Sequence, residues 1–495
     1  MSRILQYFSI GIAIFYFLSS HVASHPFDLL KRTSVYKGRT NATEATAFAL
    51  TYGAPIGAYV NFTAGSLAAV GTNAIQHRRV LIEQSLRAVV RPNHDTLYSS
   101  ATIDLSQVDV VLEVPIIPDR YWAYSLYDFY GNNFANIGVI NRNQPGKYLV
   151  RYVVDDGIMP GLQRSCDGYM GFVDSPTPYA SLLVRILVRD QGLDLEKVHT
   201  YQNRTHLYAV SQTSNPRCSQ SIPGLSSRLL NSSLSTDVNV RILEQTARLA
   251  PNNPPQEISD LTRVNRILEQ AGLKDGFYTP NPNVNLTAAA AMSAEWLNSI
   301  FTTPGQIIDL GNGWQHPSYD RCGDFGLHYE VRAEIAYNGY LPLVSTEALY
   351  PAYHASNNDL RAELSLNTNE SLIFTFASKP PLEKSGFWSF TAYGADQFLI
   401  PNPMDRYTLG DRSNLRHAGG TPLYPGAAVT ENEPFEILVQ PANVAPPANW
   451  TSNWLPSPAG GGTFTVNLRF YGPSDELRNG SWPYPVVTRS AAIQA

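Results

Sequence analysis

Alternation of apolar and polar side chains is clearest near the C-terminus, between residues 463 and 470. Phe464, Val466, Leu468 and Phe470 alternate there with polar residues. A period of two places successive side chains on opposite faces of the backbone, so the pattern predicts a strand with one buried face. Companion strands are expected at 373–376, 387–393 and 435–439. Short strands separated by Pro/Gly turns favour a β-sandwich that is jelly-roll-like in character.

The N-terminal half shows both helical and strand patterns. Residues 33–90 are expected to be mostly helical, with glycine and proline at 53–57 breaking the first apolar stretch. Asn41 and Glu44 have the spacing of a capping box, and a glycan on Asn41 would compete with that role. Apolar and β-branched or aromatic runs predict strands at 108–114, 121–130, 148–154 and 180–188.

A Ser-, Asn- and Pro-rich stretch at 216–255 marks the expected connection between two domains. Helices are expected at 194–202, 238–249, 259–273 (capped by Ser259), 286–301 and 329–337. The predicted fold is α+β, with a mixed α/β-sheet domain at 40–215, a linker with helices at 216–300 and an antiparallel β domain at 301–487.

The first residues have the features of a signal peptide spanning 1–24. Arg3 supplies a positive charge, residues 10–18 are apolar, and small residues end at Ser24. An uncleaved anchor is the alternative, although the apolar run is short for a membrane span. Lys31 and Arg32 suit a dibasic protease, so residues 25–32 are a candidate pro-segment.

Eight Asn-x-Ser/Thr sequons fit passage through the secretory pathway. They are Asn41, Asn61, Asn203, Asn231, Asn285, Asn369, Asn449 and Asn479. Together with the signal segment they predict a secreted, extracellular glycoprotein that is not bound to a membrane after cleavage.

Composition limits the classes of partner. Apolar residues make up 43% of the chain and charged residues 16%, which is typical of a globular protein. The net charge is −5 and no long basic run occurs, so a nucleic-acid partner has no electrostatic support. A small-molecule or glycan ligand is the expected partner, and a homo-oligomer is compatible with the sequence.

Three cysteines are present. In an oxidising compartment two should pair, and Cys166 with Cys218 is the favoured disulfide. Cys322 then remains as a buried thiol, a dimer link or a nucleophile.

The densest polar stretch lies at 91–104 and holds the first candidate site. Under one hypothesis His94 or Asp95 moves a proton, Tyr98 donates a hydrogen bond to substrate and Asn93 helps to bind it. Under the alternative, Asn93 and Asp95 bond their own backbone in a turn.

A second polar patch follows, and its members are Arg120, Tyr121, Tyr124, Asp128 and Asn132. Asp128 is a candidate catalytic carboxylate, and the other four are candidate substrate contacts. The patch converges on the first site if the two strands pair. Tyr124 and Asp128 share a face if their strand continues that far, and Arg120 with Asp95 or Asp128 is alternatively a structural ion pair.

Other clusters carry weaker signals. Arg332 is a candidate carboxylate-binding residue, with a helix-to-sheet salt bridge as the alternative. A metal site is not predicted from His316, Asp320, Cys322, Asp324 and His328, whose spacing matches no familiar zinc pattern. Four tryptophans are candidate sugar platforms, with core packing as the alternative, namely Trp314, Trp388, Trp454 and Trp482.

Several motifs are missing from the sequence. It contains no Gly-x-Ser-x-Gly elbow, no His-Glu-x-x-His, no dinucleotide fingerprint after a strand and no phosphate loop. Elbow-type hydrolases, zincins and nucleotide-dependent enzymes are therefore poorly supported, and no cofactor is assigned.

Eight short motifs resemble a two-domain family. In the N-terminal half, the segments 93–98, 104–106, 118–121 and 128–132 resemble domain-of-unknown-function family 1254. In the C-terminal half, the segments 347–350, 387–391, 453–456 and 469–473 resemble family 1214. The resemblance covers about residues 40–487 and implies an α+β domain followed by a jelly-roll-like β domain, without implying an activity.

Three functional hypotheses follow. The first is a secreted enzyme without an organic cofactor, a lyase, isomerase or hydrolase that uses acid/base chemistry on a small or carbohydrate-like substrate. The second is a non-catalytic extracellular protein that binds a glycan or small ligand. The third is a structural glycoprotein of the cell surface or wall, which the sequons favour and the clustered acidic residues do not.

Overall fold

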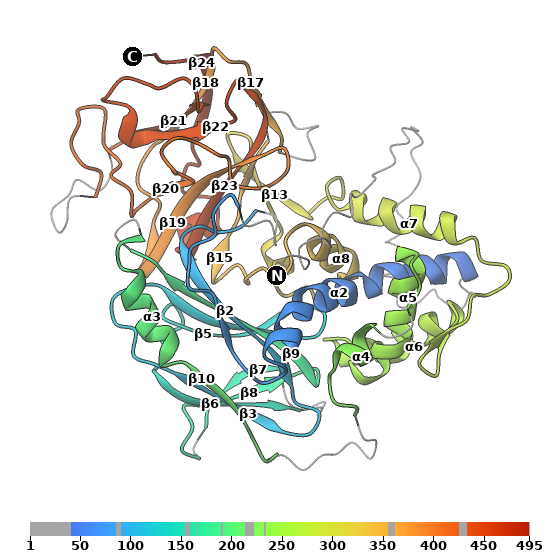
Figure 1. Ribbon diagram of the computed structural model, residues 1–495. Helices are drawn as coiled ribbons and strands as arrows, with labels where there is room; N and C mark the ends of the chain where they lie inside the picture. Colours follow the sequence, from blue (N-terminus) through green and yellow to red (C-terminus); the bar gives the residue numbers. More distant parts are fainter. Residues whose placement is uncertain are drawn as a thin grey trace, which may run out of the picture.

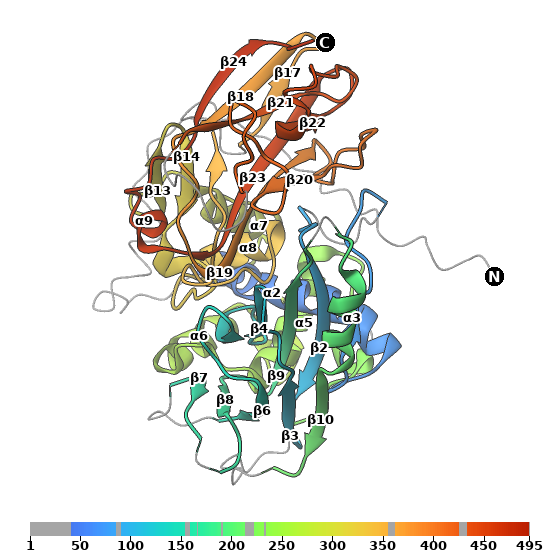
Figure 2. The ribbon, with the colours of Figure 1, turned by 90° about the vertical axis from the view of Figure 1, so that its left-hand side faces the viewer.

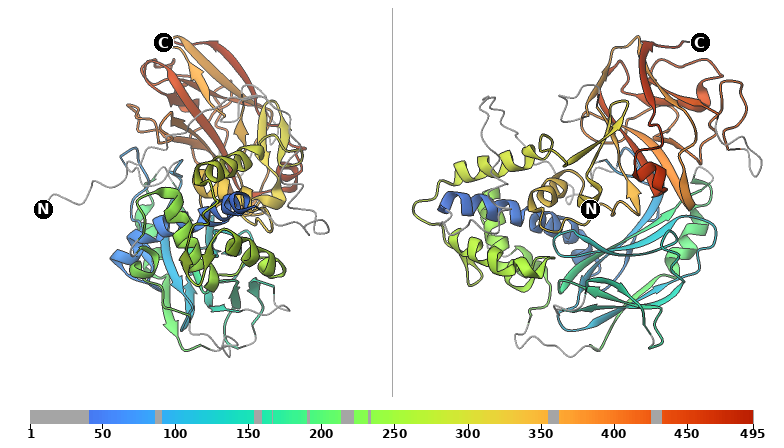
Figure 3. Two further views of the ribbon diagram at one scale, coloured as in Figure 1. Left: turned by 90° about the vertical axis from the view of Figure 1, so that its right-hand side faces the viewer. Right: turned by 180° about the vertical axis from the view of Figure 1, so that it is seen from behind.

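The computed structural model shows three lobes, of which two consist of sheets and one of helices (Figure 1). The C-terminal sheets lie above the N-terminal sheets in Figures 1 and 2, and the helices lie to one side of both (Figure 3). The structure describes residues 41–85, 91–153, 159–165, 167–189, 192–212, 222–231, 234–354, 362–424 and 433–494.

The N-terminal lobe contains two five-stranded sheets that pack face to face through a shared apolar core. The first sheet is antiparallel and runs in the order β1 (Gln76–His77), β2 (Thr96–Asp104), β9 (Tyr179–Leu187), β4 (Trp122–Tyr127) and β5 (Asn133–Gly138). The second runs in the order β10 (His206–Val210), β3 (Asp109–Val114), β6 (Gly146–Tyr152), β8 (Gly171–Ser175) and β7 (Gly161–Gln163). The helix α3 (Leu195–Asn203) adds Val198 and Tyr201 to the core, on the side away from the helical lobe (Figure 1).

The helical lobe is built around α2 (Ala42–Ala69). Residues 45–56 of this helix are all buried, which is typical of a helix covered on every side. The helices that contact it are α4 (Ser227–Asn231), α5 (Val238–Leu249), α6 (Leu261–Gln270), α7 (Leu286–Ser299) and α8 (Tyr329–Asn338). A small hairpin of β11 (Leu273–Lys274) and β12 (Phe277–Tyr278) packs on α5. The predicted linker region therefore supplies most of a lobe that the N-terminal helix completes.

The C-terminal lobe is sheet-rich and mostly antiparallel. Its larger sheet has the order β13 (Ile307–Gly311), β14 (Trp314–Pro317), β16 (Ala352–Tyr353), β23 (Gly462–Pro473), β19 (Leu382–Gly394) and β20 (Thr408–Gly410), and β15 (Ala348–Leu349) and β17 (Leu364–Leu366) also pair with β23. The smaller sheet has the order β22 (Trp454–Ser457), β21 (Phe435–Pro441), β18 (Glu370–Phe376) and β24 (Val486–Ala491), and α9 (Asp475–Arg478) follows β23. Phe374 and Phe390 meet across the two sheets with ring centroids 4.8 Å apart, so an aromatic core joins them.

The alternation at 463–470 is confirmed, because Phe464, Val466, Leu468 and Phe470 all lie in this core. The expectation of only one buried face is wrong, since Arg469 on the opposite face is 3% exposed. Its guanidinium donates to the carbonyl of Arg91 at 3.0 Å, so that face is covered by the N-terminal lobe.

The expected break at 53–57 is also wrong. The helix α2 continues through Pro55, and a Cβ on Gly53 would lie 1.9 Å from the Thr246 hydroxyl of α5. Gly53 therefore allows a close approach of two helices rather than ending one. Residues 71–85 are not helical, whereas the Asn41 side chain does accept from the Glu44 amide at 2.9 Å, as the capping spacing predicts.

The remaining predicted helices and strands are found within a few residues of their expected bounds. One cap differs. The helix expected from Ser259 begins at Leu261, and Asp260 precedes it without a side-chain capping bond. The carboxylate of Asp260 is instead paired with Arg263 at 2.6 Å.

Candidate functional site

The segment 91–95 joins the two sheet lobes through its backbone. The Arg469 guanidinium donates to the Arg91 carbonyl, and the Tyr393 hydroxyl donates to the Pro92 carbonyl at 2.7 Å. Arg91 has a φ of 48°, a left-handed conformation that few non-glycine residues adopt. The turn is therefore held in place by β19 and β23 of the C-terminal lobe.

Asn93 has two structural roles. Its side-chain oxygen accepts from the Asp95 amide at 2.5 Å, as the turn hypothesis predicts. Its side-chain nitrogen donates to the Tyr471 hydroxyl at 2.6 Å, a contact between the lobes. The turn and the domain interface are thus the same feature.

Asp95 forms a buried ion pair with Arg412, and their atoms are 2.5 Å apart. The Asp95 side chain is 1% exposed, and its second oxygen, Oδ2, has no hydrogen-bond partner among the described residues. Arg412 also pairs with Asp411 at 2.6 Å and lies 4.6 Å from the centre of the Phe387 ring. One carboxylate oxygen of Asp95 therefore remains available inside the protein.

His94 faces the other way. Its Nδ1 lies 2.6 Å from the Ile82 carbonyl, and its ring packs edge-on against Tyr407 at 5.0 Å. Asp95 instead points to Arg412 of the C-terminal lobe, so His94 and Asp95 do not serve one site.

Arg185 lies opposite Tyr98 across the β2–β9 pair. The residue is 5% exposed, and its guanidinium donates to the Tyr127 hydroxyl and the Leu341 carbonyl, both at 3.3 Å. Among the described residues no carboxylate lies within salt-bridge distance of it, although its charge is near enough to Glu347 to lower the pKa of that carboxyl. Both partners that Arg185 does have are neutral.

Glu347 is a buried carboxylate to which the sequence hypotheses gave no catalytic or binding role. Its Oε1 accepts from Asn141 at 2.5 Å, and its Oε2 has no partner among the described residues. Burial raises its pKa to about 7, against the opposing effects of the Asn141 bond and of Arg185. Its carbonyl accepts from the Gly472 amide at 2.8 Å, which fixes it beside β23.

We call this buried polar group the seam, because it lies where the two sheet lobes meet. Its members are Asn93, Asp95, Tyr98, Arg185, Glu347, Arg412 and Tyr471. Three charged members of the seam, Arg185, Glu347 and Arg412, had no assigned role in the sequence hypotheses. The sequence does carry a signal for two of them. Arg185 is the one charged residue in the apolar run 180–188, and Glu347 opens a family motif.

The predicted second patch divides between several environments. Arg120 pairs with Asp119 and Asp194, at 3.0 and 2.6 Å, rather than with Asp95 or Asp128. It is therefore a structural ion-pair centre on the flank of α3.

The two tyrosines of this patch lie in different environments. Tyr121 packs on Phe387 and Tyr471 at the seam, with ring centroids 5.1 and 5.3 Å apart. Tyr124 lies in the core between the N-terminal sheets and bonds Thr205 at 2.7 Å. It shares no face with Asp128, because β4 ends at Tyr127 after a β-bulge.

Asp128 forms a turn after β4. Its carboxylate accepts from the amides of Tyr130 and Asn132 and, at 2.6 Å, from the Asn132 side chain. Burial raises its pKa, against the opposing effect of these bonds and of Arg332.

Arg332 lies next to that turn in a cage of tyrosine rings. Its guanidinium carbon is 4.9, 4.4 and 4.8 Å from the ring centres of Tyr52, Tyr130 and Tyr329. Neither its Nε nor its Nη1 has a hydrogen-bond partner within the described chain. The predicted helix-to-sheet salt bridge is not found among the described residues, and cation–π contacts take its place.

The remaining candidates are dispersed or buried. Cys322 is a free, buried thiol that contacts the Leu343 carbonyl, and burial raises its pKa to about 12. The proposed partners Cys166 and Cys218 both lie outside the described residues. No group of three or more His, Cys, Asp or Glu side chains within the described ranges is placed to hold a metal ion.

The candidate sugar-binding tryptophans are buried, whereas the candidate glycosylation sites are exposed to solvent. Trp314, Trp388, Trp454 and Trp482 are buried at 0, 0, 3 and 5% exposure, so they are core residues. The asparagines of all eight sequons are exposed. In the part of the chain that the structure describes, no helix combines the length and apolar character needed to cross a membrane.

Comparisons with known proteins agree with this architecture. Residues 72–209 match the family described as protein of unknown function (DUF1254), and residues 347–475 match the family described as protein of unknown function (DUF1214). The first match contains Asp95 and Arg185, and the second contains Glu347, Arg412 and Tyr471. No curated protein matches the chain.

Two solved structures are similar. One is the crystal structure of the VPA0106 protein from Vibrio parahaemolyticus, with a TM-score of 0.59 and 18% identity over 90% of this chain and 99% of that chain. The other, from Burkholderia cenocepacia, has a TM-score of 0.41 and 10% identity over 88% of this chain and 87% of that chain. The first likeness shows a shared fold.

Proposed function

This chain belongs to the two-domain family that joins DUF1254 to DUF1214, and we propose that it is an enzyme whose seam performs proton transfer on an anionic small molecule. The observation that carries the proposal is the charge pattern of the seam. Arg185 is buried with neutral partners only, while Asp95 and Glu347 each present a buried oxygen without a partner. A buried cation without a counter-ion is costly, and an anionic ligand would remove that cost.

The proton carrier in this proposal is Glu347. A general acid or base works best when its pKa lies close to the working pH, and the pKa of Glu347 is about 7. Asp95 is paired with Arg412, so it would orient a substrate hydroxyl or stabilise developing positive charge.

Tyr98, whose ring lies beside the Arg185 guanidinium, and Tyr471, which accepts from Asn93, supply hydroxyls to the seam. The roles first given to His94 and Arg120 pass to Glu347 and Arg185, because the former pair face other environments. The supported reaction class is a lyase, isomerase or hydrolase acting on a carboxylate-bearing small molecule, acidic sugars included. No organic cofactor is required by this chemistry.

The seam is closed in this conformation. Asp95, Arg185 and Glu347 are 4, 5 and 1% exposed, so substrate entry would require the lobes to separate at segment 91–95 or at the loop before β15. Closure of a site around its substrate excludes water and strengthens the charge interactions inside.

We also propose that the protein is a secreted glycoprotein. The signal-like residues 1–24 and the eight exposed sequons support this. Passage through an oxidising compartment would also allow Cys166 to pair with Cys218.

The test is incubation of the purified secreted protein with a mixture of small carboxylates, acidic sugars and oligosaccharides. Mass spectrometry would follow both the free compounds and those that remain bound. A compound consumed in large molar excess over protein is expected, and Glu347→Gln should lower its turnover by about 10²- to 10⁴-fold. Glu370→Gln, at a surface ion pair, is the matched control and should be unaffected.

Two results would overturn the proposal. Full activity in Glu347→Gln would remove Glu347 from the chemistry. A compound retained unchanged in stoichiometric amounts would favour the alternative of a non-catalytic binding protein.

A further inference from the structure

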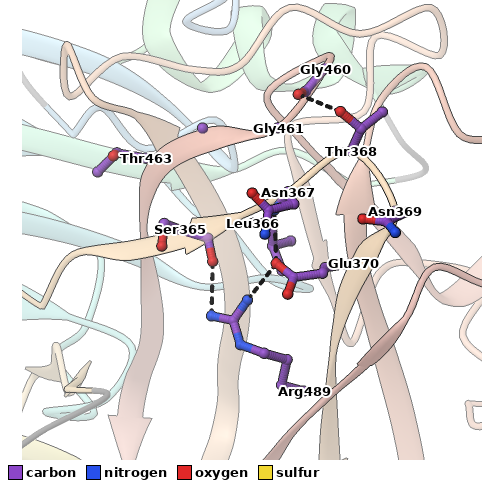
Figure 4. Close-up of a pocket in the computed structure, with 11 residues that line it drawn as sticks. Ser365, Leu366, Asn367, Thr368, Asn369, Glu370, Gly460, Gly461, Thr463 and Arg489 are labelled. Carbon is purple, nitrogen blue, oxygen red and sulfur yellow. Dashed lines mark hydrogen bonds and ion pairs between the residues drawn. The ribbon is translucent and has the colours of Figure 1, made fainter.

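A polar groove lies at the outer end of the C-terminal lobe, far along β23 from the seam. Its volume is about 630 Å³. It is formed by the turn between β17 and β18, the glycine turn before β23 and a side chain from β24 (Figure 4). A volume of several hundred Å³ is typical of ligand pockets.

The glycine turn gives the groove its shape. Gly460, Gly461 and Gly462 have φ values of 78°, 87° and 124°, which favour glycine. A Cβ on Gly461 would lie 2.5 Å from the Leu366 carbonyl, so the two turns touch through their backbones. The Thr368 hydroxyl donates to the Gly460 carbonyl at 3.0 Å and ties them together.

The charged groups of the groove satisfy one another. Arg489 pairs with Glu370 at 2.9 Å and donates to the Ser365 carbonyl at 2.8 Å. Glu370 also accepts from the Asn367 amide at 2.8 Å. The groove therefore offers neutral hydroxyls, amides and carbonyls rather than a net charge, which suits a neutral, hydroxyl-rich ligand such as a sugar.

Asn369 is both a sequon asparagine and a lining residue of this groove (Figure 4). It is exposed, and no described residue forms a hydrogen bond with its side-chain amide. Asn41, Asn203, Asn285 and Asn479, in contrast, use their side-chain oxygens in bonds within the protein.

We propose that the N-glycan on Asn369 folds back and that its first sugars occupy this groove. Three observations carry the inference: the attachment residue lines the groove, the volume suits a small ligand, and the lining is polar without net charge. The occupant is tethered, so its effective concentration is high and modest contacts suffice to hold it. The inference rests on the secretory route proposed above and is independent of the chemistry at the seam.

The predicted consequence is protection of one glycan among several. The full-length secreted protein would be treated with a peptide N-glycosidase without denaturation, and glycopeptides would be quantified over time by mass spectrometry. Release of the glycan from Asn369 should be slower than release from Asn449 by about tenfold or more, because the enzyme can act only after the Asn369 glycan has left the groove. Asn449 is the control, since its sequon is exposed and outside the groove. After denaturation the two rates should be equal.

A variant separates this cause from local sequence effects. Thr463 is exposed, lines the groove and lies outside the sequon of Asn369. Thr463→Trp should fill the groove and bring release from Asn369 up to the rate at Asn449, whereas Thr463→Ala should leave the protection in place.

Three results would overturn the inference: an unoccupied Asn369 in protein glycosylated elsewhere, equal native release at Asn369 and Asn449, or protection that survives Thr463→Trp. Absence of glycans from every sequon would instead remove the secretory route, which both proposals share. Loss of turnover in Glu347→Gln tests only the seam.

Discussion

Replacement of Arg412 by methionine tests the ion pair that joins the two lobes. Methionine keeps much of the side-chain length but removes the guanidinium, so both Asp95 oxygens would then be buried without a partner. Breaking a buried pair in this way typically costs about 3–5 kcal/mol. Asp411 would lose the same partner, but its side chain is 24% exposed, so water would offset part of that loss. We expect a free energy of unfolding lower by about 3–5 kcal/mol.

A double variant provides an internal control for the expected loss in the free energy of unfolding. In Asp95→Asn with Arg412→Met the buried carboxylate charge is removed along with its partner. The double variant should therefore be less destabilised than the sum of the two single variants, with a coupling energy of about 1–3 kcal/mol.

The assay is urea unfolding followed by tryptophan fluorescence and by far-ultraviolet circular dichroism. The first transition is the relevant one, because two lobes need not unfold together. A loss below about 1 kcal/mol would refute the view that this pair is desolvated and joins the lobes.

Three further predictions concern stability. Burial lowers the pKa of His316 from 6.5 to about 4, so the unfolded chain binds the proton more tightly than the folded protein does. The free energy of unfolding should therefore fall by up to about 3 kcal/mol as the pH drops from about 6.5 to 4. His316→Gln should flatten that pH dependence in urea titrations. Tyr471→Phe leaves the Asn93 amide without its buried acceptor and should cost about 1–3 kcal/mol by the same titration, and no change would show that the contact is replaced by water. Gly272→Ala should lower the melting temperature, because Gly272 has a φ of 90° and a Cβ there would lie 2.0 Å from the Thr279 carbonyl; an unchanged temperature would contradict this geometry.

The strands and most helices could be predicted because their periodic patterns are local. The alternation at 463–470 identified the core side of β23, and the run 238–249 gave the bounds of α5. The break at 53–57 failed because Gly53 packs on Thr246, a contact that no local pattern encodes.

The site was predicted in part for a similar reason. The stretch 91–98 does lie at the candidate site, but its partners Arg412 and Tyr471 are more than 300 residues away in the chain. The opposite directions of His94 and Asp95 depend on which residues cover each side of the turn. A single sequence carries no direct signal for those contacts.

The position of α2 in the helical lobe has a consequence for the order of synthesis. Residues 45–56 are apolar or small and wholly buried, yet the helices that cover them extend to Asn338. At about 5–20 residues per second, roughly 10–50 seconds of translation separate the emergence of α2 from that of α8. The cover of this apolar helix is complete only at the end of the interval, so the nascent chain should bind holding chaperones through its N-terminal segment. Fragments that end before residue 338 should aggregate, whatever the quality of the sheets they contain.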